Sequence, residues 1–172
     1  MLRAVLALML ALFVTGAHAR AASPAQNGWS FVSPQHMERM PAVARVAIQE
    51  ARRLCGGEDI RVRNGFLRYL NGPTDEEFVV VHFDEFHCTN GHALCSSQGC
   101  MHRVFFAKSG DKYREVWRGN VRQIDMKVSS GHPSMDIDCG HYGAHCNHHL
   151  RWNGSQFRPN LDLCSQSLGG DC

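Results

Sequence analysis

The eight cysteines constrain the fold more than any other feature of this sequence, because all of them follow an apolar leader. Arg3 precedes an apolar run over residues 4–16, and the small residues Ala17 and Ala19 then favour cleavage after Ala19. The run is shorter than the roughly 20 residues needed to cross a bilayer. We therefore expect a signal peptide over residues 1–19, export to the periplasm or beyond, and no stable membrane insertion after cleavage.

An even number of cysteines in an oxidising compartment predicts disulfides. Closeness in the sequence favours three local pairs, and elimination leaves a fourth that would join a helix end to a strand end. The proposed pairs are Cys95–Cys100, Cys139–Cys146, Cys164–Cys172 and Cys55–Cys88. Other connectivities remain open. Sulfur is therefore expected to be structural in this chain.

The charge balance argues against one class of partner. Without Arg3, the chain keeps 17 Lys and Arg residues against 16 Asp and Glu residues. A nucleic-acid binder would show a basic excess or stripe, so no nucleic-acid partner is expected. Residues 20–33 have the small residues and turn formers of a flexible lead-in. Residues 34–172 are long enough for a single disulfide-rich domain with its own core.

A helix is predicted near the start of this domain, because apolar residues recur there at steps of three and four. It begins at Pro34 or Pro41 and ends at Cys55, where Gly56-Gly57 follows. Its apolar stripe consists of Met40, Val43, Ala47, Ala51 and Leu54.

After Gly57 the apolar pattern alternates, which predicts strands. Asn64-Gly65 indicates a hairpin, and the run from Phe78 to Val81 indicates a buried central strand. Gly119-Asn120 is read as a tight turn. The expected fold class is α+β, with one N-terminal helix packed on a disulfide-stapled antiparallel meander sheet. The expected strands are 60–63, 66–70, 77–83, 101–107, 113–118, 121–128, 135–139, 149–152 and 156–158.

A histidine-rich segment offers metal-binding chemistry. Imidazoles at this density, just after Asp136 and Asp138, suit Zn²⁺ or Cu²⁺, and a Cys139–Cys146 bridge would hold two of them close together. Their spacing matches no recognised zinc motif, since Tyr142 stands where a zinc-protease helix needs glutamate. No cofactor is therefore expected, and a periplasmic metal-binding protein is the alternative. Its ligands would be His141, His145, His148 and His149.

A second polar cluster, from His82 to His92, follows the expected central strand. Strand alternation places His82 and Asp84 on one face and Glu85 and His87 on the other. The side chains are therefore not expected to converge into a general acid and base pair. We interpret the cluster as a strand that runs into a solvated loop.

Residues 97–103 resemble the Ser-x-Gly-Cys-apolar-Arg signature of the L,D-transpeptidases, exported enzymes with a cysteine nucleophile. The resemblance implies a cell-wall-directed enzyme in which Cys100 attacks. The chain departs from the signature because His102 stands before Arg103, and because Asn90-Gly91-His92 reverses the family's histidine–glycine element. A Cys95–Cys100 bridge would also remove the thiol. This enzyme is a second alternative.

A longer resemblance covers residues 88–158. It rests on Cys95-x-x-x-Gly99-Cys100, on Tyr113-Arg-Glu-Val-Trp117, on the glycine-containing 139–146 loop, and on Leu150-Arg-Trp152-Asn-Gly154-Ser-Gln-Phe157. These elements resemble small exported proteobacterial domains that are mostly uncharacterised. In general shape such domains are similar to periplasmic lysozyme inhibitors and related immunity proteins. The resemblance implies no catalytic residues.

Together these patterns favour a non-catalytic binding module that acts on a protein or cell-envelope partner. Loops held by disulfides lose less conformational freedom on association, which favours the 84–100 and 139–149 loops as the contact surface. The residues expected to contact the partner are Asp84, Glu85, His87, His92 and Tyr142.

Overall fold

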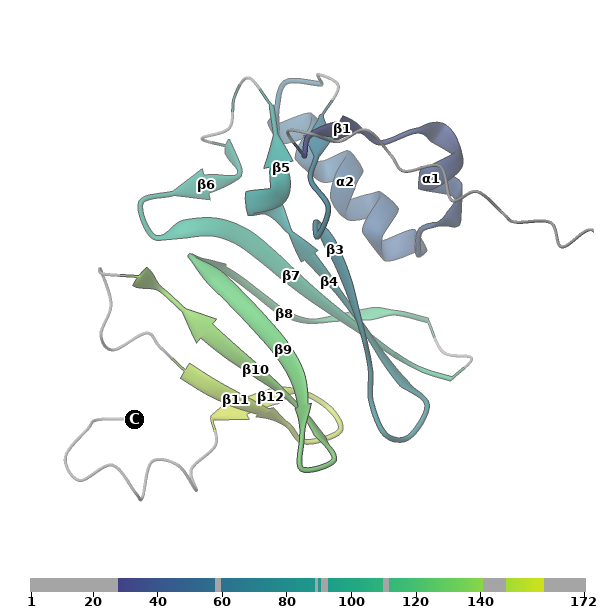
Figure 1. Cartoon of the computed structure of the whole chain (residues 1–172), viewed down its shortest axis with the longest axis vertical. Helices are drawn as coiled ribbons and strands as arrows, with labels where there is room; N and C mark the ends of the chain where they lie inside the picture. The colour runs from purple at the N-terminus through teal and green to yellow at the C-terminus, as the bar shows by residue number, and fades with distance from the viewer. Residues whose placement is uncertain are drawn as a thin grey trace, which may run out of the picture.

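The computed structural model describes residues 28–57, 60–88, 90, 93–109, 112–140 and 148–159. Most of these residues lie in strands, which form three antiparallel sheets, and two helices lie between the first and second strands (Figure 1). The predicted α+β class, with one helix on a single meander, is therefore wrong: the described chain is mainly β. None of the helices among the described residues has the length and apolar character needed to span a membrane.

Pro41 divides the predicted helical stretch into two helices, α1 (Pro34–Arg39) and α2 (Ala42–Leu54). Ser33 caps α1, since its Oγ accepts a hydrogen bond from the His36 N–H at 3.2 Å. Pro41 has extended backbone and stands at the N-cap of α2. The buried face of α2 is rotated relative to the predicted stripe, because Leu54 is exposed while Ala44, Ala47, Ile48 and Ala51 are buried.

The central sheet forms around β4 (Glu76–His82) and β7 (Gly99–Lys108). Its strand order is β3-β4-β7-β6, and β8 also pairs with β7. The run Phe78-Val79-Val80-Val81 in β4 is fully buried, as predicted for a central strand. The remaining strands are β3 (Leu67–Asn71), β6 (Cys95–Ser96) and β8 (Arg114–Val121).

Two smaller sheets complete the described fold. The N-terminal sheet has the order β1-β2-β5, and the 3₁₀ turn η1 (Phe83–Glu85) joins β4 to β5. Its strands are β1 (Ser30–Phe31), β2 (Arg61–Val62) and β5 (Phe86–His87). The C-terminal sheet has the order β12-β11-β10-β9. Its strands are β9 (Gln123–Ser129), β10 (His132–Asp138), β11 (His148–Trp152) and β12 (Phe157–Pro159).

The central sheet has a hydrophobic core on each face, because successive residues of a strand point to opposite sides. Val79 and Val81 pack with α2 and the N-terminal sheet. Phe78 and Val80 pack with the C-terminal sheet. Figure 1 shows the helices and the C-terminal sheet on opposite sides of β4 and β7. Sheet-on-sheet packing thus provides one of the two core clusters, which a single meander covered by one helix would not do.

Two predicted turns differ from the structure. Asn64-Gly65 does not close a hairpin, because β2 pairs with β1 and β5 whereas β3 pairs with β4. Gly119 lies inside β8, and a Cβ there would stand 2.8 Å from the Trp117 ring. This glycine therefore makes room for a neighbouring side chain. The break between strands β8 and β9 falls instead at Arg122.

Disulfides join Cys55 to Cys88 and Cys95 to Cys100, and both pairs are among those that the sequence predicts. Cys139 is disulfide-bonded as well. The predicted partner Cys146, and the predicted pair Cys164–Cys172, lie outside the described residues. Disulfides are consistent with an exported protein, because reducing compartments keep thiols unpaired.

A cluster of ion pairs joins α2 to the central sheet around Arg103, whose side chain is 8% exposed. Arg103 binds Glu50 of α2 and Glu115 of β8, and Arg118 binds Glu115 at 2.8 Å. Burial alone would raise the pKa of Glu115, but hydrogen bonds from Arg118 and Arg103 outweigh it and hold the pKa below its usual value. The ionised form of Glu115 therefore stabilises the fold.

We expect Glu115→Gln to lower the free energy of unfolding at pH 7 by about 1.5–3 kcal/mol, as for other hydrogen bonds to charged groups. A carboxyl whose pKa is lowered by folding stabilises above its unfolded pKa and loses that effect as the pH falls through its folded pKa. The difference from wild type should therefore shrink on acidification, in urea titrations from pH 7 to pH 3. Asp125→Asn, in an exposed pair with Arg68, is the control and should change little. A difference that is constant with pH would contradict the assignment.

Candidate functional site

A cleft of about 300 Å³ lies where the two predicted binding loops, 84–100 and 139–149, meet. One wall is the β6–β7 turn, which belongs to the 84–100 loop. The other wall begins the 139–149 loop. We call this feature the cystine cleft, because each wall contains a disulfide-bonded cysteine or adjoins one. Its lining residues are Ser96, Ser97, Gln98, Gly99, Arg122, Cys139 and Gly140.

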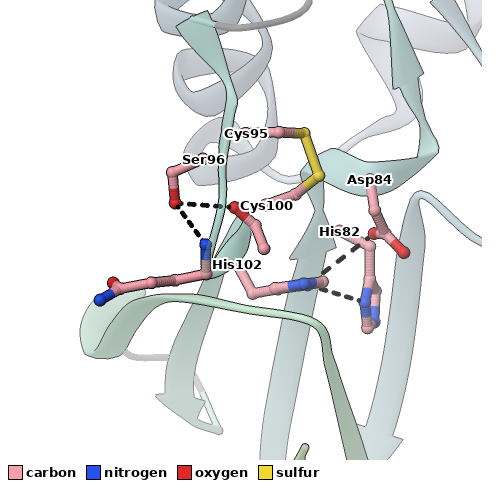
Figure 2. Close-up of a disulfide and its surroundings, with 8 residues drawn as sticks. His82, Asp84, Cys95, Ser96, Cys100 and His102 are labelled. Carbon is pink, nitrogen blue, oxygen red and sulfur yellow. Dashed lines mark hydrogen bonds and ion pairs between the residues drawn. A yellow bond between two sulfur atoms is a disulfide. The ribbon is translucent and has the colours of Figure 1, made fainter. Parts of the chain in front are cut away.

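The β6–β7 turn is fixed by its own contacts (Figure 2). Cys95 and Cys100 are paired across the strands and joined by a disulfide. Ser96 Oγ accepts a hydrogen bond from the Gln98 N–H at 3.2 Å and donates one to the Gly99 carbonyl at 3.3 Å. Gly99 has a φ of +128°, and a Cβ on it would lie 2.2 Å from the Val121 carbonyl. Glycine alone allows this approach, so the turn is held against the end of β8.

The opposite wall is also held by local contacts. The Gly140 N–H donates to Asp138 Oδ1 at 2.7 Å, and Gly140 has the positive φ that glycine favours. Arg122 Nε lies 3.9 Å from Asp138 Oδ2, and the Arg122 side chain is 64% exposed. This long ion pair leaves the guanidinium accessible at the cleft. An anionic group of a partner is the chemistry that it suits.

Two buried histidines lie near the Cys95–Cys100 disulfide. His82 ends β4 and His102 lies directly opposite it in β7. Their Nδ1 atoms are 3.1 Å apart, and His102 Nδ1 is 3.9 Å from Asp84 Oδ1 in η1. Figure 2 shows the three side chains pointing toward one another beside the Cys95–Cys100 bridge. The three residues come from three different elements, and the pairing of β4 with β7 brings them together.

Burial keeps this histidine pair uncharged. The pKa of His82 is lowered to about 3, mainly by burial and also by repulsion from the positive charges of His102 and Arg68. Burial also lowers the pKa of His102, while Asp84 and the Val121 carbonyl act in the opposite direction. His102 Nε2 makes no hydrogen bond of good geometry, although that carbonyl lies beside the ring. Both imidazoles are therefore neutral at pH 7, with nitrogen lone pairs available.

The polar residues of the His82–His92 cluster do not stay together. Of the described ones, only Asp84 lies beside the histidine pair. Glu85 faces Arg63, with Oε2 3.8 Å from Nε, and His87 is exposed with its ring 5.3 Å from that of Trp29. Asp84 instead turns toward His102. His92 lies outside the described residues.

Only part of the predicted histidine-rich site is described. His148 is exposed at the start of β11, and the half-buried His149 hydrogen-bonds Asp136. Lys127 binds the other oxygen of the same carboxylate. His141, Tyr142 and His145 lie outside the described residues. Within the described part, His149 is engaged in a hydrogen bond to Asp136 on the sheet surface.

His102 is the residue that sequence reasoning missed. In the sequence it stands out only as a departure from the transpeptidase signature, 20 residues from His82. The pairing register of β4 with β7 would have identified the contact, but alternation within one strand carries no information about its partner. In the same signature, Cys100 is disulfide-bonded and has no free thiolate with which to attack.

The described residues around the cystine cleft thus combine a polar cleft with rigid walls, the accessible guanidinium of Arg122, and a buried pair of neutral imidazoles beside the Asp84 carboxylate. No protein-family model, curated protein or solved structure matches the chain.

Proposed function

We propose that the protein is an exported, non-catalytic binding module that presents the cystine cleft to a protein or cell-envelope partner. One observation carries the proposal: the cleft is lined by Arg122 and by two loops that are far apart in the sequence, and a disulfide-bonded cysteine stands in or beside each loop. The α+β architecture expected for such a module is not part of the proposal. Its scaffold is the set of three antiparallel sheets.

Rigid walls favour binding because a preformed surface loses little conformational entropy on association. The Ser96 hydrogen bonds, the close contact of Gly99 with Val121 and the Asp138–Gly140 turn all fix backbone that lines the cleft. A surface of this kind suits recognition.

Arg122 is the residue that we propose as the anchor for the partner. Arginine is enriched among residues that dominate binding energy, and its planar guanidinium pairs with carboxylates or phosphates through two hydrogen bonds. The exposed residues Ser97 and Gln98 line the same cleft. The partner should therefore present an anionic group that enters the cleft.

The test is capture of a partner from a cell-envelope extract by the immobilised, oxidised protein, followed by measurement of the dissociation constant for the purified partner. Arg122→Glu should weaken that affinity by at least about tenfold, because it places like charges together. Arg68→Glu is a matched control, since Arg68 is similarly exposed, has a similarly long ion pair with Asp125 and lies outside the cleft. It should leave the affinity unchanged.

Two results would overturn the proposal. One is capture no greater than that by a reduced, unfolded sample of the same chain. The other is an equal loss of affinity in both arginine variants, which would indicate a general charge effect in place of recognition at the cleft.

A further inference from the structure

The contact between His82 and His102 is unusual because two buried imidazoles face each other through their Nδ1 atoms. His102 is fully buried and His82 is 5% exposed. Nitrogens 3.1 Å apart must share either a proton or a cation, because two lone pairs at that distance repel. A shared proton would satisfy only the two Nδ1 atoms. His102 Nε2 then remains without a well-formed partner.

The spacing of the three polar atoms fits a metal ion. Zinc binds imidazole nitrogen at about 2.0–2.1 Å, so tetrahedral geometry places neighbouring ligand atoms about 3.3–3.4 Å apart. The two Nδ1 atoms lie within a few tenths of an ångström of that separation. Ligand atoms of His82, Asp84 and His102 all lie within 4.8 Å of one another. Asp84 would need a small side-chain movement, which its position in the exposed part of η1 allows.

The donor set also selects a class of ion. Two neutral imidazoles and a carboxylate suit Zn²⁺ and Cu²⁺, whereas Mg²⁺ and Ca²⁺ prefer sites made of oxygen ligands. Asp84 provides the negative charge that two neutral rings lack. Its side chain is 35% exposed, so the cluster opens to solvent on this side. An ion therefore has a route to the two histidines, although both are buried.

We propose that His82, Asp84 and His102 form a binding site for Zn²⁺ or Cu²⁺. The site differs from the predicted histidine-rich segment in every ligand, and it goes beyond the proposed recognition at the cystine cleft. An ion there would join β4, η1 and β7 at one point. It would therefore stabilise the folded chain by a free energy that grows with the logarithm of the ion concentration over its dissociation constant.

The test is titration of Zn²⁺ into the oxidised, chelator-treated full chain, by calorimetry and by the shift in melting temperature. We expect one ion at this site and a rise in melting temperature. Asp84→Asn and His82→Gln should each weaken zinc affinity by at least about tenfold, since even outer partners of metal ligands have effects of that size. Because Asp84 is exposed, Asp84→Asn decides the question even if His82→Gln does not fold.

Two controls separate this site from others. His87→Gln removes an exposed histidine close in the sequence and should leave zinc affinity unchanged. Combined alanine substitution of His141, His145 and His148 should also leave this binding event in place. The electron paramagnetic resonance spectrum of bound Cu²⁺ should show nitrogen coupling that is lost in His82→Gln.

The proposal is wrong if folded Asp84→Asn binds Zn²⁺ as wild type does, or if the triple alanine variant abolishes all binding. It is equally wrong if the wild type binds neither ion at micromolar concentration, in which case the two histidines share a proton. None of these results bears on the cystine cleft. Arg122→Glu should bind zinc normally, so the two proposals fail separately.

Discussion

Replacement of Phe78 by alanine should lower the free energy of unfolding by about 3–5 kcal/mol, the range for buried phenylalanine. Phe78 is fully buried in β4, on the face that meets the C-terminal sheet. Its ring lies 5.2 Å from that of Phe106, 5.1 Å from Trp152 and 5.8 Å from Phe157. These three rings belong to β7, β11 and β12. The cavity that Phe78→Ala leaves would therefore be bordered by separate strands that cannot easily collapse into it.

The measurement is equilibrium urea unfolding of the oxidised protein, followed by circular dichroism. Phe31→Ala is the control, because Phe31 is 59% exposed on β1 and should change stability little. A loss below about 1 kcal/mol for Phe78→Ala would mean that the two sheets do not share this core. The variant thus tests the sheet-on-sheet packing that the sequence did not predict.

Features determined by short-range pattern could be predicted from the sequence. The uninterrupted run from Phe78 to Val81 indicates a strand buried on both faces, and the structure buries it between two cores. Gly56-Gly57 ends α2 because both glycines have positive φ, and Gly57 N–H donates to the Arg52 carbonyl at 2.8 Å. Closeness in the chain sufficed for the Cys95–Cys100 pair.

Features determined by strand pairing could not be predicted from the sequence. Alternation shows that a segment is a strand but not which strand lies beside it, so nine expected strands could be read as one meander. The fold class was wrong for this reason. Asn64-Gly65 has the composition of a hairpin, yet it connects β2 and β3, which lie in different sheets. The same limit hid His102, because its proximity to His82 depends on the register of β4 with β7.

Removal of the Cys55–Cys88 disulfide should cost about 4 kcal/mol, against about 2 kcal/mol for Cys95–Cys100, in the chain-entropy description of cross-links. The difference follows from loop length, because the bridges span 33 and 5 residues. The longer bridge ties the end of α2 to the residue after β5, and both of its cysteines are buried. The Cys55→Ala/Cys88→Ala and Cys95→Ala/Cys100→Ala variants should therefore differ clearly in urea unfolding without reductant.

We expect the opposite order for binding: loss of the Cys95–Cys100 bridge should weaken partner affinity more than loss of the Cys55–Cys88 bridge. Cys95–Cys100 closes the turn that forms one wall of the cystine cleft, whereas Cys55 and Cys88 do not line it. Loss of the short bridge should release the turn and weaken partner affinity in a protein that remains folded. If Cys95→Ala/Cys100→Ala instead unfolds the chain as much as Cys55→Ala/Cys88→Ala does, the short bridge is a structural cross-link of the core. Its position at the cleft would then say nothing about recognition.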